Sequence, residues 1–175
     1  AEVSVEVAEA YGSALLNPKQ PAVMVLSRQN LPTLDRTNLG PANGVAKGGY
    51  ILKEARGGEA ECILIGTGSE IPLCLDAADI LDSDGIRTRV VSLPCWELFA
   101  EQDDEYREHV LPSNIPSRVA CEAASGFGWE RWLGQKGTFI GMNGFGASGP
   151  AKKLFEHFGI TAEAVVAAAR TLVGK

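Results

Sequence analysis

The 175-residue chain is poor in the residue types from which many self-contained active sites are built. It has two histidines, His109 and His157, and the sequence assigns neither a Ser, Cys or carboxylate partner. Aromatic residues make up 7% of the chain, which argues against a stacking platform for nucleic-acid bases. The net charge is −6, and Lys and Arg are spread along the chain rather than gathered into a basic patch. These scarcities disfavour a self-contained hydrolase, a metal site and a nucleic-acid-binding protein.

Cysteine pairs and long apolar runs are missing as well. No CxxC pair and no His at metal-ligand spacing accompanies the four cysteines, Cys62, Cys74, Cys95 and Cys121. We expect them to be small, mostly buried thiols in a reducing compartment. The first 16 residues lack the basic region and long apolar core of a signal peptide. No run approaches the roughly 20 apolar residues of a membrane span, so the sequence predicts a cytoplasmic protein without membrane contact.

The first 49 residues lack the regular alternation of predicted strands and helices that characterises the rest of the chain. The chain begins without Met, inside a predicted helix over residues 3–16, and we therefore expect a fragment of a longer protein, with a processed N-terminus as the alternative. "AVMVLS" at 22–27 is a continuous apolar run closed by Ser, which is typical of a parallel strand buried on both faces. Residues 29–49 are rich in Pro, Gly, Asn and Thr, and their length predicts an interdomain linker.

From residue 49 onward, strands and helices alternate. The predicted strands are 49–55, 62–68, 88–94, 117–124 and 138–142. Helices are predicted at 69–81, within 103–112, at 129–133, after a Ser148 cap to residue 159, and after a Thr161 cap to about 172. This alternation is typical of an α/β fold, with helices on both faces of a mostly parallel five-stranded sheet in a three-layer αβα arrangement. The strand at 49–55 is the most polar and should lie at an edge.

Two glycine-rich turns lead into helices. "GTGSE" at 66–70 offers the backbone N–H groups of Gly66, Thr67, Gly68 and Ser69 to an anion at a helix N-terminus, or forms a tight turn capped by Ser69. The sequence leaves both interpretations open and favours the tight turn, because neither GK[ST] nor a full GxGxxG follows. "GFGASGP" at 144–150 presents the same choice, with Ser148 and Pro150 explained by capping.

Two charged residues stand at strand ends. Glu122 interrupts the apolar run "VACEAA" and needs a partner, in a crevice or at a subunit interface. Arg28 follows the predicted strand at 22–27 directly, and ligands bind at the carboxyl ends of strands in open α/β sheets. A guanidinium suits a phosphate or a carboxylate, and its alternative role is to hold the loop in place.

Six blocks of the sequence together resemble the C-terminal part of transketolases: "LSRQNLP" at 26–32, "KGGYIL" at 47–52, "IGTGSE" at 65–70, "RVVSLP" at 89–94, "YREHVLP" at 106–112 and "FGASGPAKKLFEHFG" at 145–159. Their order and spacing agree over nearly the whole chain. The resemblance implies that residues 1–39 are the tail of a pyrimidine-binding domain and that 40–175 form a C-terminal domain with one antiparallel edge strand. It also implies that Arg28 binds the phosphate of the substrate.

The resemblance further implies an enzyme that transfers a two-carbon ketol unit from a ketose phosphate to an aldose phosphate in the pentose phosphate pathway. Such enzymes are homodimers that use thiamine diphosphate and Mg²⁺, and the carbanion chemistry is the cofactor's. The family's cofactor ligands, metal ligands and catalytic residues match no position here. We therefore expect an isolated fragment that is inactive and binds no cofactor or metal. A second hypothesis is a non-catalytic regulatory module that binds an anion or nucleotide at 66–70.

Overall fold

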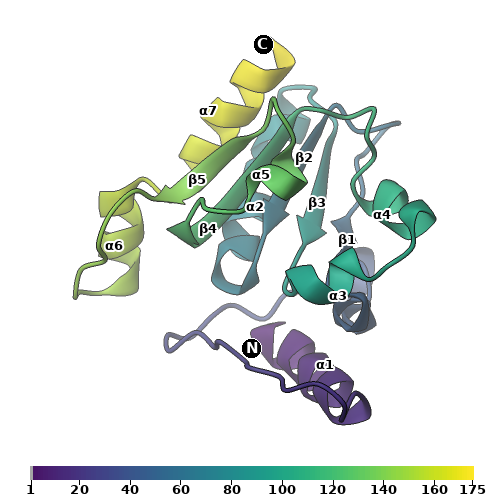
Figure 1. The fold of residues 1–175 in the computed structure, drawn as a ribbon. Coiled ribbons are helices and arrows are strands. Elements are labelled where there is room, and N and C mark those ends of the chain that lie inside the picture. The colour runs from purple at the N-terminus through teal and green to yellow at the C-terminus, as the bar shows by residue number, and fades with distance from the viewer. Residues whose placement is uncertain (1) are drawn as a thin grey trace.

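The computed structural model describes the backbone of residues 2–175 and the side chains of residues 5–175. Within this range, five strands form a mixed sheet in the order β1-β3-β2-β4-β5 (Figure 1). Strands β3, β2, β4 and β5 run parallel, and β1 pairs antiparallel with β3 at one edge. The strands are β1 (Tyr50–Lys53), β2 (Cys62–Gly66), β3 (Thr88–Ser92), β4 (Arg118–Ser125) and β5 (Thr138–Met142). The predicted sheet, with its antiparallel edge strand, is confirmed.

The central strand β2 shows why the sequence of the sheet is so apolar. All five residues of β2 are buried. Leu64 belongs to one half of the core, whereas Ile63 and Ile65 belong to the other. A strand with neighbours on both sides and helices over both faces has no solvent-facing side, so its apolar residues run continuously instead of alternating.

Helices cover both faces of the sheet, which confirms the three-layer prediction (Figure 1). Helices α2 and α7 pack on one face, and α3, α4 and α5 contribute to the core on the other. The helices are α1 (Glu2–Leu16), α2 (Ile71–Ser83), α3 (Trp96–Ala100), α4 (Asp104–Val110), α5 (Glu130–Leu133), α6 (Ala151–Phe158) and α7 (Ala162–Val173). None of these helices is both long and apolar enough to cross a membrane.

One of the three predicted helix caps is confirmed. The Thr161 hydroxyl accepts a hydrogen bond from the backbone N–H of Ala164, at 3.2 Å, as an N-cap residue does. The prediction for Ser69 is wrong, because α2 follows a short 3-10 helix, η3 (Gly68–Glu70), and the Ser69 hydroxyl donates to a side chain instead. The prediction for Ser148 is also wrong, because the chain enters α6 through Pro150 with no side-chain cap.

The segment predicted as an interdomain linker, residues 29–49, is partly helical. It contains two 3-10 helices, η1 (Arg36–Asn38) and η2 (Ala42–Lys47). Helix α1 contacts η2 and lies outside the three layers, next to the carboxyl ends of the parallel strands (Figure 1). The division of the chain between residues 39 and 40 stays a prediction.

The buried strand predicted at 22–27 is wrong for this chain. These residues have no regular secondary structure, and the side chains of Val23 and Val25 are 88% and 94% exposed. The physical reason is the lack of a neighbour: a parallel strand needs another strand beside it to bond its backbone N–H and C=O groups. Among the described residues, no strand lies alongside this segment.

Candidate functional site

Helix α1 is held against the C-terminal ends of the strands by a cluster of polar side chains. The Tyr50 hydroxyl donates to Glu6 Oε1 at 2.5 Å, and the Ser92 hydroxyl donates to the same oxygen at 2.8 Å. Arg36 Nη2 donates to the Tyr50 hydroxyl at 3.1 Å and lies 3.8 Å from Glu6 Oε1. We call Glu6, Arg36, Tyr50 and Ser92 the junction cluster.

The junction cluster is largely removed from water. Ser92 is fully buried, Tyr50 is 4% exposed, and the side chains of Glu6 and Arg36 are 12% and 18% exposed. Burial raises the pKa of Tyr50, and the nearby Glu6 carboxylate raises it further, so the phenol stays protonated and can donate. Arg36 also donates to the carbonyl of Gly40, at 2.5 Å. The cluster therefore joins α1, the linker and the sheet.

A groove of about 640 Å³ lies beside this junction. One wall is formed by α1 and by residues 20–27, and the other by the segments that follow β2 and β3, including Thr67, Gly68 at the start of η3 and Trp96 at the start of α3. The structure thus brings the apolar segment before Arg28 together with part of the predicted anion turn. The sequence predicted these two features separately.

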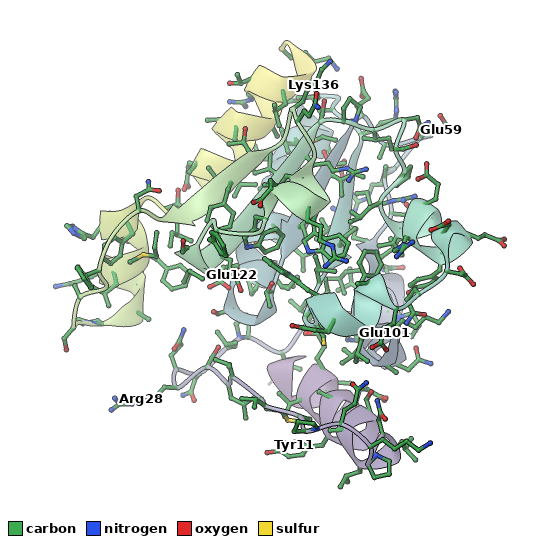
Figure 2. All side chains as sticks on the ribbon, viewed as in Figure 1. Tyr11, Arg28, Glu59, Glu101, Glu122 and Lys136 are labelled. Carbon is green, nitrogen blue, oxygen red and sulfur yellow. The ribbon has the colours of Figure 1, made fainter. Side chains whose placement is uncertain are left out.

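Arg28 lies in a bend at the end of that segment and is exposed. Figure 2 shows its side chain pointing away from the sheet. Among the side chains that the structure describes, none forms a hydrogen bond or ion pair with the guanidinium. The donor fork of Arg28 is therefore available for an anionic group.

The turn at 66–70 is built around a buried carboxyl group. Gly68 has a φ of +52°, and the Thr67 hydroxyl donates to the carbonyl of Leu93 at 3.4 Å. The Ser69 hydroxyl donates to Glu70 Oε1 at 2.7 Å, and Glu70 is only 3% exposed. The side chains of this turn are therefore used within the protein.

The electrostatics of the turn favour the neutral form of the Glu70 carboxyl and disfavour a bound anion. Burial is the main cause that raises the pKa of Glu70 to about 7, and the Glu122 carboxylate adds to it. The hydrogen bond from Ser69 acts in the opposite direction, since it stabilises the ionised form. An anion bound at Gly66–Ser69 would lie next to a carboxyl that already resists ionisation.

Glu122 has the partner that its sequence context required. Its Oε2 accepts a hydrogen bond from Nε1 of the buried Trp129, at 2.8 Å. Glu122 follows Cys121, which is paired with Gly66 at the end of β2, so the carboxylate lies near the carboxyl end of β4 (Figure 2). An indole donor within the same chain is therefore one partner of this carboxylate.

The remaining candidate residues form no site in the part of the chain that the structure describes. His109 and His157 are exposed, and the His157 ring stacks edge-on against Phe158 with the ring centroids 4.8 Å apart. Cys62, Cys74 and Cys121 are buried, as predicted, and Cys95 is half-buried; all four are free thiols. Residues 143–150, which include the second glycine-rich turn, are exposed. Among all the residues that the structure describes, no group of three or more His, Cys, Asp or Glu side chains is arranged to hold a metal ion.

Sequence reasoning missed the junction cluster. Glu6 is 44 residues from Tyr50 and 86 residues from Ser92. The available signals were a carboxylate within the helix over residues 3–16 and a tyrosine in "KGGYIL". Neither signal indicates which residue is the partner, because residues so far apart in the chain form no periodic pattern in the sequence.

Comparisons with known proteins agree with this architecture. The family model for the transketolase-like TK C-terminal domain matches residues 48–161. Transketolase 7 of Craterostigma plantagineum is 52% identical over 170 residues, which cover 95% of this chain and 25% of that protein. The structure of transketolase from Leishmania mexicana has a TM-score of 0.87 and 40% identity, over 97% of this chain and 24% of that one. The Pichia stipitis transketolase complex with sedoheptulose-7-phosphate has a TM-score of 0.85 and 37% identity, with the same coverage.

This chain thus spans about a quarter of the length of the relatives that it matches. The similarity extends beyond the conserved domain model to the segments on either side of it, because almost the whole chain is aligned in each comparison. The fold agrees independently, since the neighbours share the mixed sheet with helices on both sides. The chain belongs to the transketolase family and corresponds to its C-terminal region.

Proposed function

We propose that the chain is part of an enzyme that transfers a two-carbon ketol unit from a ketose phosphate to an aldose phosphate in the pentose phosphate pathway. The full-length enzyme works as a homodimer in the cytoplasm. In this proposal, Arg28 binds the phosphate of the sugar, and the domain from about residue 40 supports the architecture around the site.

The observation that carries this proposal is the exposed guanidinium of Arg28, which has no partner among the described side chains, on a segment that lines a groove. A planar fork of donors binds phosphate oxygens in pairs, which a lysine cannot do. The P. stipitis transketolase structures include complexes with fructose-6-phosphate, sedoheptulose-7-phosphate and xylulose-5-phosphate. These complexes support sugar phosphates as the substrate class of the full-length enzyme to which this chain belongs in our proposal.

Thiamine diphosphate and Mg²⁺ belong, in this proposal, to the part of the enzyme outside this chain. The donor set of the described residues does not fit a metal ion, since no suitable cluster of acidic, His or Cys side chains is present in them. When bound, the cofactor supplies the electron sink for breaking the carbon–carbon bond. The contribution of this chain is to bind and orient the substrate through Arg28.

Exposed apolar residues support a larger assembly. Leu16, Val23 and Val25 are between 86% and 94% exposed, on α1 and the segment that follows it. We infer that the rest of the enzyme covers them and supplies the neighbouring strand that 22–27 lacks here. Large apolar side chains that are exposed in this way often mark a surface that another part of an assembly covers.

The experiment that tests the role of Arg28 is a donor comparison in the full-length enzyme. Arg28→Ala removes a charge-assisted contact worth about 1.5–3 kcal/mol, which is roughly one to two decades in kcat/KM for a phosphorylated ketose. The loss should lie mainly in KM, because the phosphate is far from the reacting carbons. An unphosphorylated ketose should lose much less. Equal losses on both donors would assign Arg28 to loop support and reject the phosphate role.

A second experiment tests the proposed division of labour within the enzyme. The isolated 175-residue chain should show no ketol transfer, and calorimetric titration with thiamine diphosphate and Mg²⁺ should give no saturable heat. The same chain should not bind inorganic phosphate or a nucleotide at Gly66–Glu70, where the buried Glu70 carboxyl opposes an anion. Saturable binding of either anion that Gly68→Ala abolishes would favour the regulatory module instead.

A further inference from the structure

Two members of the junction cluster flank the segment that carries Arg28, Glu6 on α1 before it and Arg36 directly after it. Helix α1, which contains Glu6, ends at Leu16, and the chain then runs without a helix or strand to η1, which begins at Arg36. Glu6 and Arg36 approach each other to 3.8 Å. Glu6 and Arg36 are therefore two anchors that close residues 7–35 on themselves, and this closed segment consists of the rest of α1 and the loop 17–35 that carries Arg28.

The two anchors are rigid for separate reasons. Glu6 is the fifth residue of a 15-residue helix, so fixing its side chain restrains the helix from which the loop leaves ten residues later. At the other end, the Asp35 carboxylate caps η1 by accepting from the backbone N–H of Thr37 at 2.9 Å, and Arg36 donates to the Gly40 carbonyl. Closing a loop at both ends lowers the number of positions that its tip can occupy.

The contacts between the anchors depend on two residues of the sheet. The Tyr50 hydroxyl donates to Glu6 and accepts from Arg36, so this one oxygen joins the two anchors. The Ser92 hydroxyl provides a second donor to Glu6. In a buried network of this kind, removing one member leaves its partners unpaired, which loosens the contact more than the loss of an exposed hydrogen bond would.

We propose that the junction cluster is a positioning device, in which Tyr50 and Ser92 of the C-terminal domain set the place of Arg28 and so tune the binding of phosphorylated substrates. This inference rests on the proposed phosphate role of Arg28. Tyr50 and Ser92 do not touch the substrate. They act through Glu6 and Arg36, and the C-terminal domain thereby gains a part in substrate selection.

The test uses Tyr50→Phe in the full-length enzyme, because this variant keeps the ring in the core and removes only the hydroxyl. Loss of one such hydrogen bond should raise KM for a phosphorylated ketose about two- to tenfold. The kcat for that donor, and both constants for the unphosphorylated ketose, should change by less than about twofold. Ser92→Ala, which removes the other donor to Glu6, should give a smaller effect with the same selectivity.

Lys53→Met is the matched control. Lys53 lies on the same strand, is 9% exposed, and pairs with Asp79 and Asp82 at 2.7 and 3.3 Å, away from the loop. This variant also breaks a buried polar contact of β1, so it reports on general loosening of the domain. We expect Lys53→Met to leave the ratio of the two KM values unchanged.

A double variant separates positioning from stability. In an Arg28→Ala background, Tyr50→Phe should have no further effect on KM for the phosphorylated ketose, because the side chain that it positions is gone. Additive effects, or equal effects of Tyr50→Phe on both donors, would refute the positioning role while leaving the role of Arg28 intact. If Arg28→Ala alone affects both donors equally, the phosphate role and the positioning role both fail.

Discussion

Replacing Glu70 by Gln should remove a large pH dependence from the stability of this chain. Glu70 is 3% exposed, and its pKa is raised from an ordinary value of 4.5 to about 7, mainly by burial. A raised pKa means that the folded state holds the proton more tightly than the unfolded state does. The stability gained from this group is thus fully present below about pH 4.5 and is lost as the pH rises through about 7.

The size of the effect follows from the two pKa values. A difference of roughly 2.5 corresponds to about 3 kcal/mol, at about 1.36 kcal/mol for each pKa unit. The linkage relation places about 0.8 kcal/mol of this loss below pH 5 and about 2.5 kcal/mol between pH 5 and pH 8. Gln resembles the protonated acid in shape and does not ionise. Glu70→Gln should therefore hold its stability across this range while the unaltered chain weakens.

Urea unfolding at pH 5, 6, 7 and 8, followed by tryptophan fluorescence, to which the buried Trp129 and Trp132 contribute, measures this difference. Glu163→Gln is a suitable control, since Glu163 is exposed and local hydrogen bonds at the start of α7 lower its pKa. The control should keep the slope of the unaltered chain above pH 5. Parallel slopes for Glu70→Gln and the unaltered chain between pH 5 and pH 8 would refute the assignment of this titration to Glu70.

Two further substitutions test the local structure. Thr161→Ala removes the side-chain cap of α7 and should lower the free energy of unfolding by about 1 kcal/mol, measured by urea unfolding; Thr161→Ser should restore most of it. Gly48→Ala places a Cβ against the Cys95 carbonyl at a φ of +80°, and should destabilise the chain by about 1–3 kcal/mol in the same assay. Gly57 has a similar φ of +78°, but a Cβ added there would meet no other atom. An equal loss of unfolding free energy in Gly57→Ala would therefore show that the contact with the Cys95 carbonyl is unimportant.

Local patterns were sufficient for the C-terminal domain. The continuous apolar run of β2 predicted a strand covered on both faces, and the polar strand at 49–55 predicted an edge; both are confirmed. These predictions succeed because the position of a strand in the sheet decides which of its residues are buried. Buried positions are apolar, so the pattern of apolar residues within the strand indicates its position. Thr161 was predictable for the same reason, since a cap acts within three residues.

Local patterns failed where the outcome depended on a partner. Residues 22–27 have the composition of a buried strand, yet they remain exposed because no strand among the described residues lies beside them. Ser69 was expected to cap a helix and instead donates to Glu70. In both cases the local sequence favours the predicted structure, a strand at 22–27 and a helix cap at Ser69. The surrounding structure decides whether that structure forms.

The sequence by itself determined the α/β order of the elements, the edge position of β1, the burial of most of the cysteines, and Arg28 as a candidate ligand at the end of an apolar run. Only the tertiary structure decided that Glu6 meets Tyr50 and Ser92, and that the segment between Glu6 and Arg36, which bears Arg28, is closed at that point. The physical reason is range: helix and strand periodicity arises from neighbours a few residues apart, whereas a hydrogen bond across 86 residues forms only when the packed layers bring its two ends together.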